Sequence, residues 1–425
     1  MNTSASWQFS PRRLLGDALL VARGTIVGQG PFVLVTPLIT RLFSAADLGV
    51  YGVALAFVGI AAPVAGLRLE LAAMSARDPQ DARALTLLAA LALVPVSLVS
   101  TALLCVLKAF NVGSYGALSW GLVGVTGATV AAAGLYSVLR AWLARHGQFR
   151  MIANSLTLQG WLRAAIPVLL SPFAPGAALL LSAELAARAS SVYLMLRGRS
   201  LRRAGIPALR ERLQRYWKYP LLIAPSALID AAATMLPLPI LASFFGLGAA
   251  GKFAVAQRVV LLPAALIVGS VGDVFHAHAA NAGGDRPEAV GRFVAVTAVR
   301  LLLLALLVYT PVAVIAPFVA GAVFGSDWAD VGVMMGLLVP LCIAQTTVSP
   351  ISRGLLLSGR EERKLFADVI CLALPVTALY LTRGHSLLLA IACFSAAATL
   401  AYASYYVVIV RALQSGVRRD AGRDE

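Results

Sequence analysis

Arginines that lie inside long apolar stretches, without an acidic residue one helical turn away, are candidate functional groups, and Arg23 and Arg258 are two of them. Arg23 lies in the stretch that begins near residue 17, and Arg258 lies within VAQRVVLLP. An ionisable side chain inside a membrane span costs about 2.5–3.5 kcal/mol on insertion scales, so each is a candidate functional group. The alternative is that each long side chain extends to the nearest membrane interface. Gln29 and Gln257 add neutral hydrogen-bonding groups to the same two stretches.

Acidic residues in the apolar stretches are candidates for binding a proton or a cation. Asp230 lies about ten residues into such a stretch with no partner nearby in sequence, and Asp273 ends another. We predict ion coupling at these two residues, and the alternative for Asp230 is a salt bridge to an arginine on another helix. Glu184 and Arg188 are four positions apart and are predicted to form an ion pair within one helix. Lys364 and Asp368 repeat that spacing.

Motifs of soluble catalysis are absent from the sequence. It contains no G-x-x-x-x-G-K-[ST] motif for nucleotide phosphates and no Ser/His/Asp signature. The four histidines have no metal-ligand spacing, and the four cysteines lie inside apolar stretches without a C-x-x-C pair. We therefore predict no catalytic residues, no metal site and no cofactor, and a protein that is not an enzyme.

The composition explains why charged side chains in apolar stretches matter here. Of the 425 residues 60% are hydrophobic and 13% are charged, and the mean hydropathy is +0.84. Soluble domains are nearer half apolar and a quarter charged. This excludes a soluble enzyme, a disordered chain and a secreted disulfide scaffold, and it predicts an all-α integral membrane protein.

The apolar stretches are long enough to cross a bilayer as helices, which takes about 20 residues each. They are continuously apolar, whereas transmembrane β-strands alternate with a period of two over about ten residues. Three interior prolines, Pro225, Pro237 and Pro239, make the seventh span the one most prone to bend. The predicted spans are 17–39, 49–67, 84–107, 117–139, 154–171, 177–196, 220–243, 253–273, 294–319, 331–350, 365–381 and 386–410.

The basic residues predict how these spans are oriented. With the N-terminus inside, the inside segments contain 26 lysines and arginines, the outside segments contain 4, and 5 lie within spans. This asymmetry predicts cytoplasmic termini by the positive-inside rule. It also accounts for most of the net charge of +16 without a nucleic-acid partner. The basic segment 197–219 is predicted to be an amphipathic linker on the cytoplasmic membrane surface.

The two halves of the chain show a weak internal repeat. PLITRLFSAADLGVYGVA from Pro37 aligns without gaps with PILASFFGLGAAGKFAVA from Pro239, and the offset of 202 residues pairs Gly49 with Gly251. Chance similarity between apolar segments is the alternative explanation. If the repeat is real, it indicates two six-helix bundles in the same orientation, 1–196 and 220–425, with a substrate site between them.

Two segments resemble the polysaccharide transporter family, the O-antigen and exopolysaccharide flippases of the multidrug/oligosaccharidyl-lipid/polysaccharide exporter superfamily. The first is TRLFSAADLGVYGVALAFVGIAAPVAGLRLELAAM (40–74), with Ala46 where the family pattern has proline. The second is the stretch 216–280, which contains YPLLIAPSAL and GKFAVAQRVVLLP, with Lys252 as a departure.

This resemblance implies a fold, a substrate and a location. The fold is that of the multidrug-and-toxin extruders, in which two six-helix bundles form a V around a central cavity. The substrate is an oligosaccharide linked to undecaprenyl pyrophosphate, whose pyrophosphate would bind Arg23 and Arg258, with Gln29 and Gln257 nearby. The protein would be a multi-pass protein of the bacterial inner membrane, coupled to a proton or sodium ion and acting with a polymerase and other polysaccharide-assembly proteins.

Two other functions fit the same membrane topology. A cation-coupled multidrug antiporter would share the fold, but it would need an acidic, aromatic-lined cavity, and unpaired arginines argue against it. A membrane polysaccharide polymerase or ligase usually needs a large external loop, and the longest external segment here is about ten residues.

Overall fold

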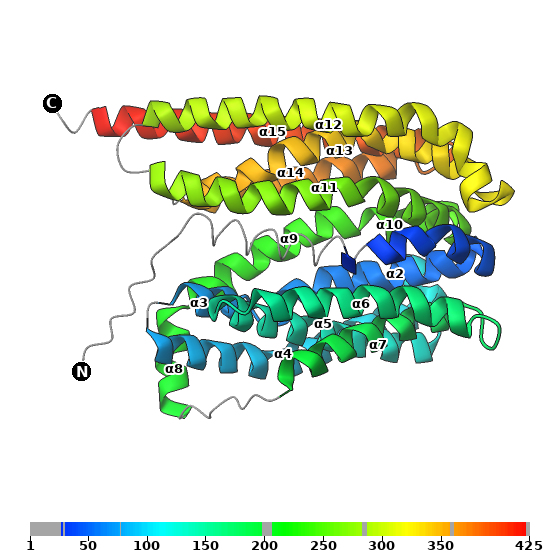
Figure 1. Ribbon diagram of the computed structural model, residues 1–425, viewed down its shortest axis with the longest axis horizontal. Helices are drawn as coiled ribbons and strands as arrows, with labels where there is room; N and C mark the ends of the chain where they lie inside the picture. Colours follow the sequence, from blue (N-terminus) through cyan, green and yellow to red (C-terminus); the bar gives the residue numbers. More distant parts are fainter. Residues whose placement is uncertain are drawn as a thin grey trace.

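The computed structural model describes residues 27–28, 30–76, 78–197, 206–282, 287–357 and 361–421, and these are almost entirely helical (Figure 1). The first described helix contains Gly30–Leu42. The other α-helices are α2 Ala45–Ala61, α3 Leu69–Ser75, α4 Pro79–Ala109, α5 Trp120–Arg145, α6 Phe149–Leu170, α7 Ala177–Leu196, α8 Ile206–Arg215, α9 Ala224–Met235, α10 Pro237–Phe245, α11 Leu247–Ala282, α12 Pro287–Phe324, α13 Ala329–Leu357, α14 Glu361–Leu381 and α15 Leu387–Ala421. Short helical turns are η1 Ala62–Val64, η2 Gly113–Ala117, η3 Tyr219–Ile223 and η4 Ser326–Trp328.

Each predicted span overlaps a helix within the described ranges. Among the described residues, seven helices are long and apolar enough to cross a membrane, or eight if the bent pair α9 and α10 counts as one span. The all-α membrane fold is therefore confirmed. Several helices extend beyond the predicted spans, as α11 and α12 do. Hydropathy marks only the part of a helix inside hydrocarbon, whereas its backbone hydrogen bonds continue into the interfacial region.

Polar residues at the helix starts explain where several helices begin. Ser44 caps α2, accepting a hydrogen bond from the Asp47 backbone N–H, and the Asp47 carboxylate accepts from the Ser44 backbone N–H in return. Asp78 caps α4 and is followed by Pro79, and Ser119 caps α5. These side chains satisfy backbone donors that have no partner within the helix.

The seventh span is bent, as its prolines predicted. Helices η3 and α9 meet α10 at 40° near Pro237. Proline lacks a backbone N–H and clashes with the carbonyl one turn earlier, so a helix bends there most readily.

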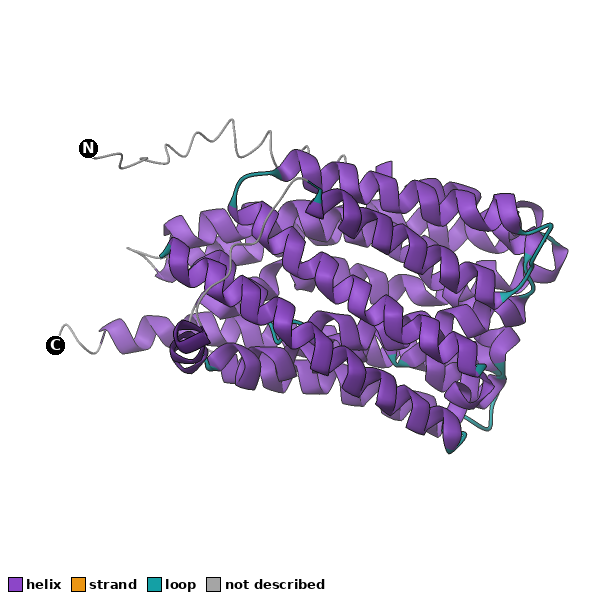
Figure 2. Ribbon diagram, turned by 90° about the horizontal axis from the view of Figure 1, so that it is seen from below, coloured by secondary structure: helices purple, strands orange, loops and turns teal. Residues whose placement is uncertain are grey.

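The helices run side by side along the long axis of the molecule and are joined at their ends by short loops (Figure 2). Figure 1 shows α4–α7 on one side and α11–α15 on the other, with α2, α9 and α10 between them. Helix α8, within the predicted linker, is fixed to the start of α4, because Arg212 Nε lies 2.7 Å from an oxygen of Asp81.

Helices α2 and α11 are in direct backbone contact near their N-terminal ends, which we predict to be the outer side. A Cβ atom on Gly49 would overlap the carbonyl oxygen of Leu247, and one on Gly251 would overlap that of Ala45. The offset of 202 residues found in the sequence relates Gly49 to Gly251 and Ala45 to Leu247, so each contact is the counterpart of the other. The contact is therefore reciprocal, as in an interface about a twofold axis, so the sequence repeat coincides with a structural repeat at this point.

Further hydrogen bonds join the two halves at the same end of the molecule. The Thr40 hydroxyl donates to the carbonyl oxygen of Phe324 at 2.9 Å, and Arg41 Nη2 donates to that of Ala322 at 3.3 Å. The predicted outer ends of the two halves are thus held together in this conformation.

Candidate functional site

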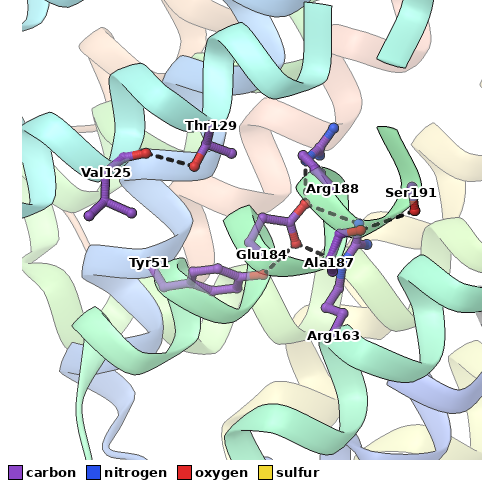
Figure 3. Close-up of polar contacts among 8 residues, drawn as sticks. All are labelled: Tyr51, Val125, Thr129, Arg163, Glu184, Ala187, Arg188 and Ser191. Carbon is purple, nitrogen blue, oxygen red and sulfur yellow. Dashed lines mark hydrogen bonds and ion pairs between the residues drawn. The ribbon is translucent and has the colours of Figure 1, made fainter. Parts of the chain in front are cut away.

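The most deeply buried ionised group among the described side chains is Glu184 on α7, which is 1% exposed (Figure 3). Arg163 on α6 lies beside both carboxylate oxygens, with Nε 2.7 Å from Oε2 and Nη2 3.0 Å from Oε1. Arg188 Nε donates to Oε1 at 2.7 Å, and the hydroxyl of Tyr51 donates to Oε2 at 3.3 Å. The i, i+4 ion pair of Glu184 and Arg188 is confirmed, and the structure adds two partners from other helices.

Polar contacts between α6 and α7 keep this arrangement in register. The buried hydroxyl of Ser191 donates to the carbonyl oxygen of Ser155 at 2.9 Å. On the α2 side, the Asp47 carboxylate accepts from the backbone N–H of Ala177 at the start of α7. These contacts fix the three helices that carry Tyr51, Arg163 and Glu184.

Arg258 on α11 approaches this cluster from the C-terminal half of the chain. Its guanidinium carbon lies 4.5 Å from the centroid of the Phe32 ring and 5.6 Å from that of Tyr51. The guanidinium of Arg163 is also over the Phe32 ring, at 5.9 Å. Aromatic faces attract cations through the ring quadrupole, so Phe32 is in contact with cations from both halves.

These groups lie at a similar depth, judged from helix geometry. At 1.5 Å per residue, Arg258 is about 16 Å from the start of α11, and Glu184 is about 10 Å from the start of α7. Arg163 is about 10 Å from the end of α6 at Leu170, which is on the same side. This places the cluster well inside the hydrocarbon layer, which is about 30 Å thick.

The cluster carries excess positive charge. Arg163, Arg188 and Arg258 face a single carboxylate, that of Glu184, which leaves a net charge of +2 among the groups described. Arg258 forms no ion pair with any residue whose side chain the structure describes. Uncompensated cations inside a membrane are costly and mark anion sites or pathways, so this site is suited to binding an anion.

A second polar group lies in the C-terminal half. Asp368 on α14 is 2% exposed and accepts a hydrogen bond from Ser226 Oγ at 3.1 Å. Asp230 is one helical turn after Ser226 on α9, and the Tyr402 hydroxyl on α15 is in electrostatic reach of both carboxylates. Asp230 and Asp368 therefore share one neighbourhood, and the side chain of Lys364, the predicted partner of Asp368, lies outside those that the structure describes.

The sequence pattern of the polysaccharide biosynthesis protein family matches residues 38–332, which is most of the chain and includes Tyr51, Glu184 and Arg258. The chain belongs to this family. No curated protein matches it in sequence.

Solved structures that are similar to this chain include membrane transporters. The lipid II flippase MurJ, in an inward closed conformation, matches with a TM-score of 0.68 and 12% identity over 95% of this chain and 86% of that chain. An inward-facing multidrug resistance MATE family transporter of the MOP superfamily matches with a TM-score of 0.64 and 15% identity over 94% and 95%. A MOP superfamily transporter from Pyrococcus furiosus matches with a TM-score of 0.62 and 13% identity over 96% of both chains.

At these identities the likeness establishes the fold, which is that of the MOP superfamily, as the resemblance predicted. Together with the apolar helices, this fold makes the protein a multi-pass membrane protein.

The structure describes only some of the site residues predicted for this polysaccharide biosynthesis protein. Arg258 lies in the cluster and Asp230 lies near Asp368. Arg23 and Gln29 lie outside the described residues, and Asp273 lies in α11 with a side chain outside them. Gln257 is half-buried, and its side chain makes no hydrogen bond to any described residue of the chain.

Sequence reasoning missed Arg163 as a site residue and treated Glu184 as part of a local ion pair. Arg163 did carry a signal, because it lies in an apolar stretch with no acidic residue three or four positions away. Nothing in the sequence showed that Glu184 is shared between helices, since its partners are 21 and 133 positions distant.

Proposed function

We propose that this protein is a flippase that moves oligosaccharides linked to undecaprenyl pyrophosphate from the cytoplasmic to the periplasmic leaflet of the bacterial inner membrane, for surface polysaccharide synthesis. The observation that carries the proposal is Arg258, a guanidinium inside the membrane that faces aromatic rings and has no carboxylate partner among the described side chains. A guanidinium fork matches the spacing of phosphate oxygens and binds them through two hydrogen bonds.

The charge of the substrate supports this assignment. A pyrophosphate esterified at both ends carries two negative charges, which equals the excess positive charge of the cluster. Such a head group cannot enter hydrocarbon unaided, because desolvating its charges costs far more than thermal energy. A negative cell interior favours outward movement of an anion by about 2.3 kcal/mol per charge per 100 mV.

Alternating access gives the two halves of the chain their roles. Arg258 belongs to the C-terminal half, and Tyr51, Arg163 and Glu184 belong to the N-terminal half. In the proposed cycle, the substrate binds between them from the cytoplasm. The outer contact of α2 and α11 then opens while the cytoplasmic side closes, so that the head group is released outside and the lipid tail stays in the bilayer.

Cells that lack the protein test this function. They should accumulate the lipid-linked oligosaccharide in the cytoplasmic leaflet and show no surface polysaccharide, and the wild-type chain should restore both. Accessibility of the glycan to a membrane-impermeant lectin in inverted vesicles and in spheroplasts measures the leaflet. A multidrug antiporter would instead alter drug tolerance without this accumulation. A polymerase or ligase would leave the lipid-linked oligosaccharide in the periplasmic leaflet.

We further propose that a proton or a sodium ion binds at Asp230 and drives release. Replacing Asp230 by asparagine removes the charge and keeps the shape of the side chain. Turnover should fall about tenfold or more and should no longer respond to the ion gradient, whereas head-group binding should stay within a factor of three. Transport in proteoliposomes, with the gradient intact or collapsed by an ionophore, measures both properties.

Asp327→Asn is the matched control, because Asp327 is an exposed aspartate in η4. It should transport like the parent chain. Full and gradient-dependent transport by Asp230→Asn would show that coupling takes place elsewhere. Polymerase and other polysaccharide-assembly proteins are the proposed partners that use the product.

A further inference from the structure

Two arginines from opposite halves of the chain share one aromatic ring. Arg258 and Arg163 both lie over Phe32, which is 4% exposed, at 4.5 and 5.9 Å from its centroid. They are also in direct electrostatic reach of each other. Two like charges this close inside a membrane repel strongly, because the surrounding medium screens them little. The arrangement is therefore suited to an anion that contacts both.

The carboxylate of Glu184 neutralises only part of this positive charge. Its oxygens are contacted by Arg163, Arg188 and the Tyr51 hydroxyl, and Arg258 forms no ion pair with them. A guanidinium has five N–H donors, and Glu184 accepts a hydrogen bond from only one nitrogen of Arg163 and one of Arg188. The side chains of Arg163 and Arg188 remain 26% and 22% exposed, whereas that of Glu184 is 1% exposed.

The environment of Glu184 therefore resembles that of a bound anionic ligand. It is an acid covered on all sides by donors, and the donors remain partly accessible while the acid does not. A carboxylate in this position offsets charge while no substrate is present. It also competes with an incoming phosphate for the same guanidinium.

We infer that Arg163 is a second binding residue for the substrate's pyrophosphate, held by Glu184 in the empty protein and shared with the substrate when it binds. The inference rests on the proposed function. One phosphate binds Arg258 and the other binds Arg163, so the anion joins the two halves across Phe32. Because Glu184 competes with the substrate, it keeps the affinity low enough for the head group to be released.

The test measures binding of farnesyl pyrophosphate to the purified full-length protein in detergent by isothermal titration calorimetry. Arg163→Gln should weaken binding tenfold or more, because it removes a charged hydrogen-bond donor. Glu184→Gln should strengthen binding at least threefold, because it removes the competitor. Arg300→Gln is the control, since Arg300 makes the same change of charge at an exposed position on α12, and it should change the affinity less than threefold.

The opposite effects of Arg163→Gln and Glu184→Gln on affinity distinguish a substrate-binding arginine from a structural ion pair. If Arg163 and Glu184 only support the fold, both single variants weaken binding and the double variant Arg163→Gln/Glu184→Gln recovers it, because neither charge is left unpaired. If Arg163 binds the substrate, the double variant stays as weak as Arg163→Gln. This comparison also holds if Glu184→Gln alone does not yield folded protein.

Arg258→Gln separates this inference from the proposed function. Loss of binding in Arg258→Gln with parent-like binding in Arg163→Gln would overturn the role of Arg163 and leave the flippase proposal intact. Parent-like binding in both variants would overturn both.

Discussion

Replacement of Arg258 by alanine is expected to abolish surface polysaccharide while the protein still inserts in the membrane. In the proposed complex, Arg258 and the pyrophosphate of the substrate form a buried, hydrogen-bonded charge pair. Truncating one member of such a pair costs about 2–5 kcal/mol, or roughly 30-fold or more in affinity. The side chain contacts rings from two other helices and has no described carboxylate partner, so its loss leaves no buried acid unpaired. The measurement is polysaccharide on the cell surface, together with the amount of protein in the membrane fraction.

Arg258→Lys should restore only part of the function. Lysine keeps the charge but presents a point charge in place of a planar fork that binds two oxygens at once. Arg300→Ala is the matched control, because Arg300 is also an arginine in an apolar stretch and its side chain is exposed on α12. Normal polysaccharide with Arg258→Ala, at normal protein levels, would rule out its role in binding pyrophosphate.

Replacement of Gly251 by valine is expected to destabilise the whole protein more than any substitution proposed above. A Cβ atom at this position would overlap the carbonyl oxygen of Ala45 and approach the backbone nitrogen of Gly49. Because these are backbone atoms, the helices themselves must separate. Overpacking a core typically costs 1–3 kcal/mol even where side chains can adjust, so we expect a loss of about 3 kcal/mol or more. The midpoint of thermal unfolding and the yield of monodisperse protein measure it.

Gly49→Val should have a similar effect, because the contact is reciprocal. Gly124→Val is the control, since it makes the same substitution inside helix α5 where a Cβ atom would meet nothing within 4 Å. Gly251→Val and Gly124→Val with equal midpoints would show that the close approach of α2 and α11 does not contribute to stability.

Several features of this protein follow from the sequence because they depend on neighbouring residues. Continuous apolar stretches fix the helices, since inside a bilayer each backbone polar group must be satisfied within its own helix. Pro225, Pro237 and Pro239, inside the seventh span, predicted the bend that α9 and α10 show. The spacing of Glu184 and Arg188 predicted their ion pair, because residues four apart meet on one helix face.

The candidate site was only partly predictable, because it depends on which helices meet. Arg258 was identified from the lack of an acidic neighbour in its own helix. The ring that it shares with Arg163 belongs to Phe32, more than 120 positions from either arginine. Glu184 was assigned to a local pair because its contacts with Arg163 and Tyr51 link separate helices.

The sequence by itself determined that this chain is a helical membrane protein with charged residues in its spans and a repeated contact segment, because hydropathy and spacing act locally. Only the tertiary structure decided which charges are shared. It placed Arg163 and Arg188 on one carboxylate and Arg258, from the other half, over the ring of Phe32, and this follows from helix packing. The pairing of charges depends on distances in space, which an apolar stretch of sequence does not encode.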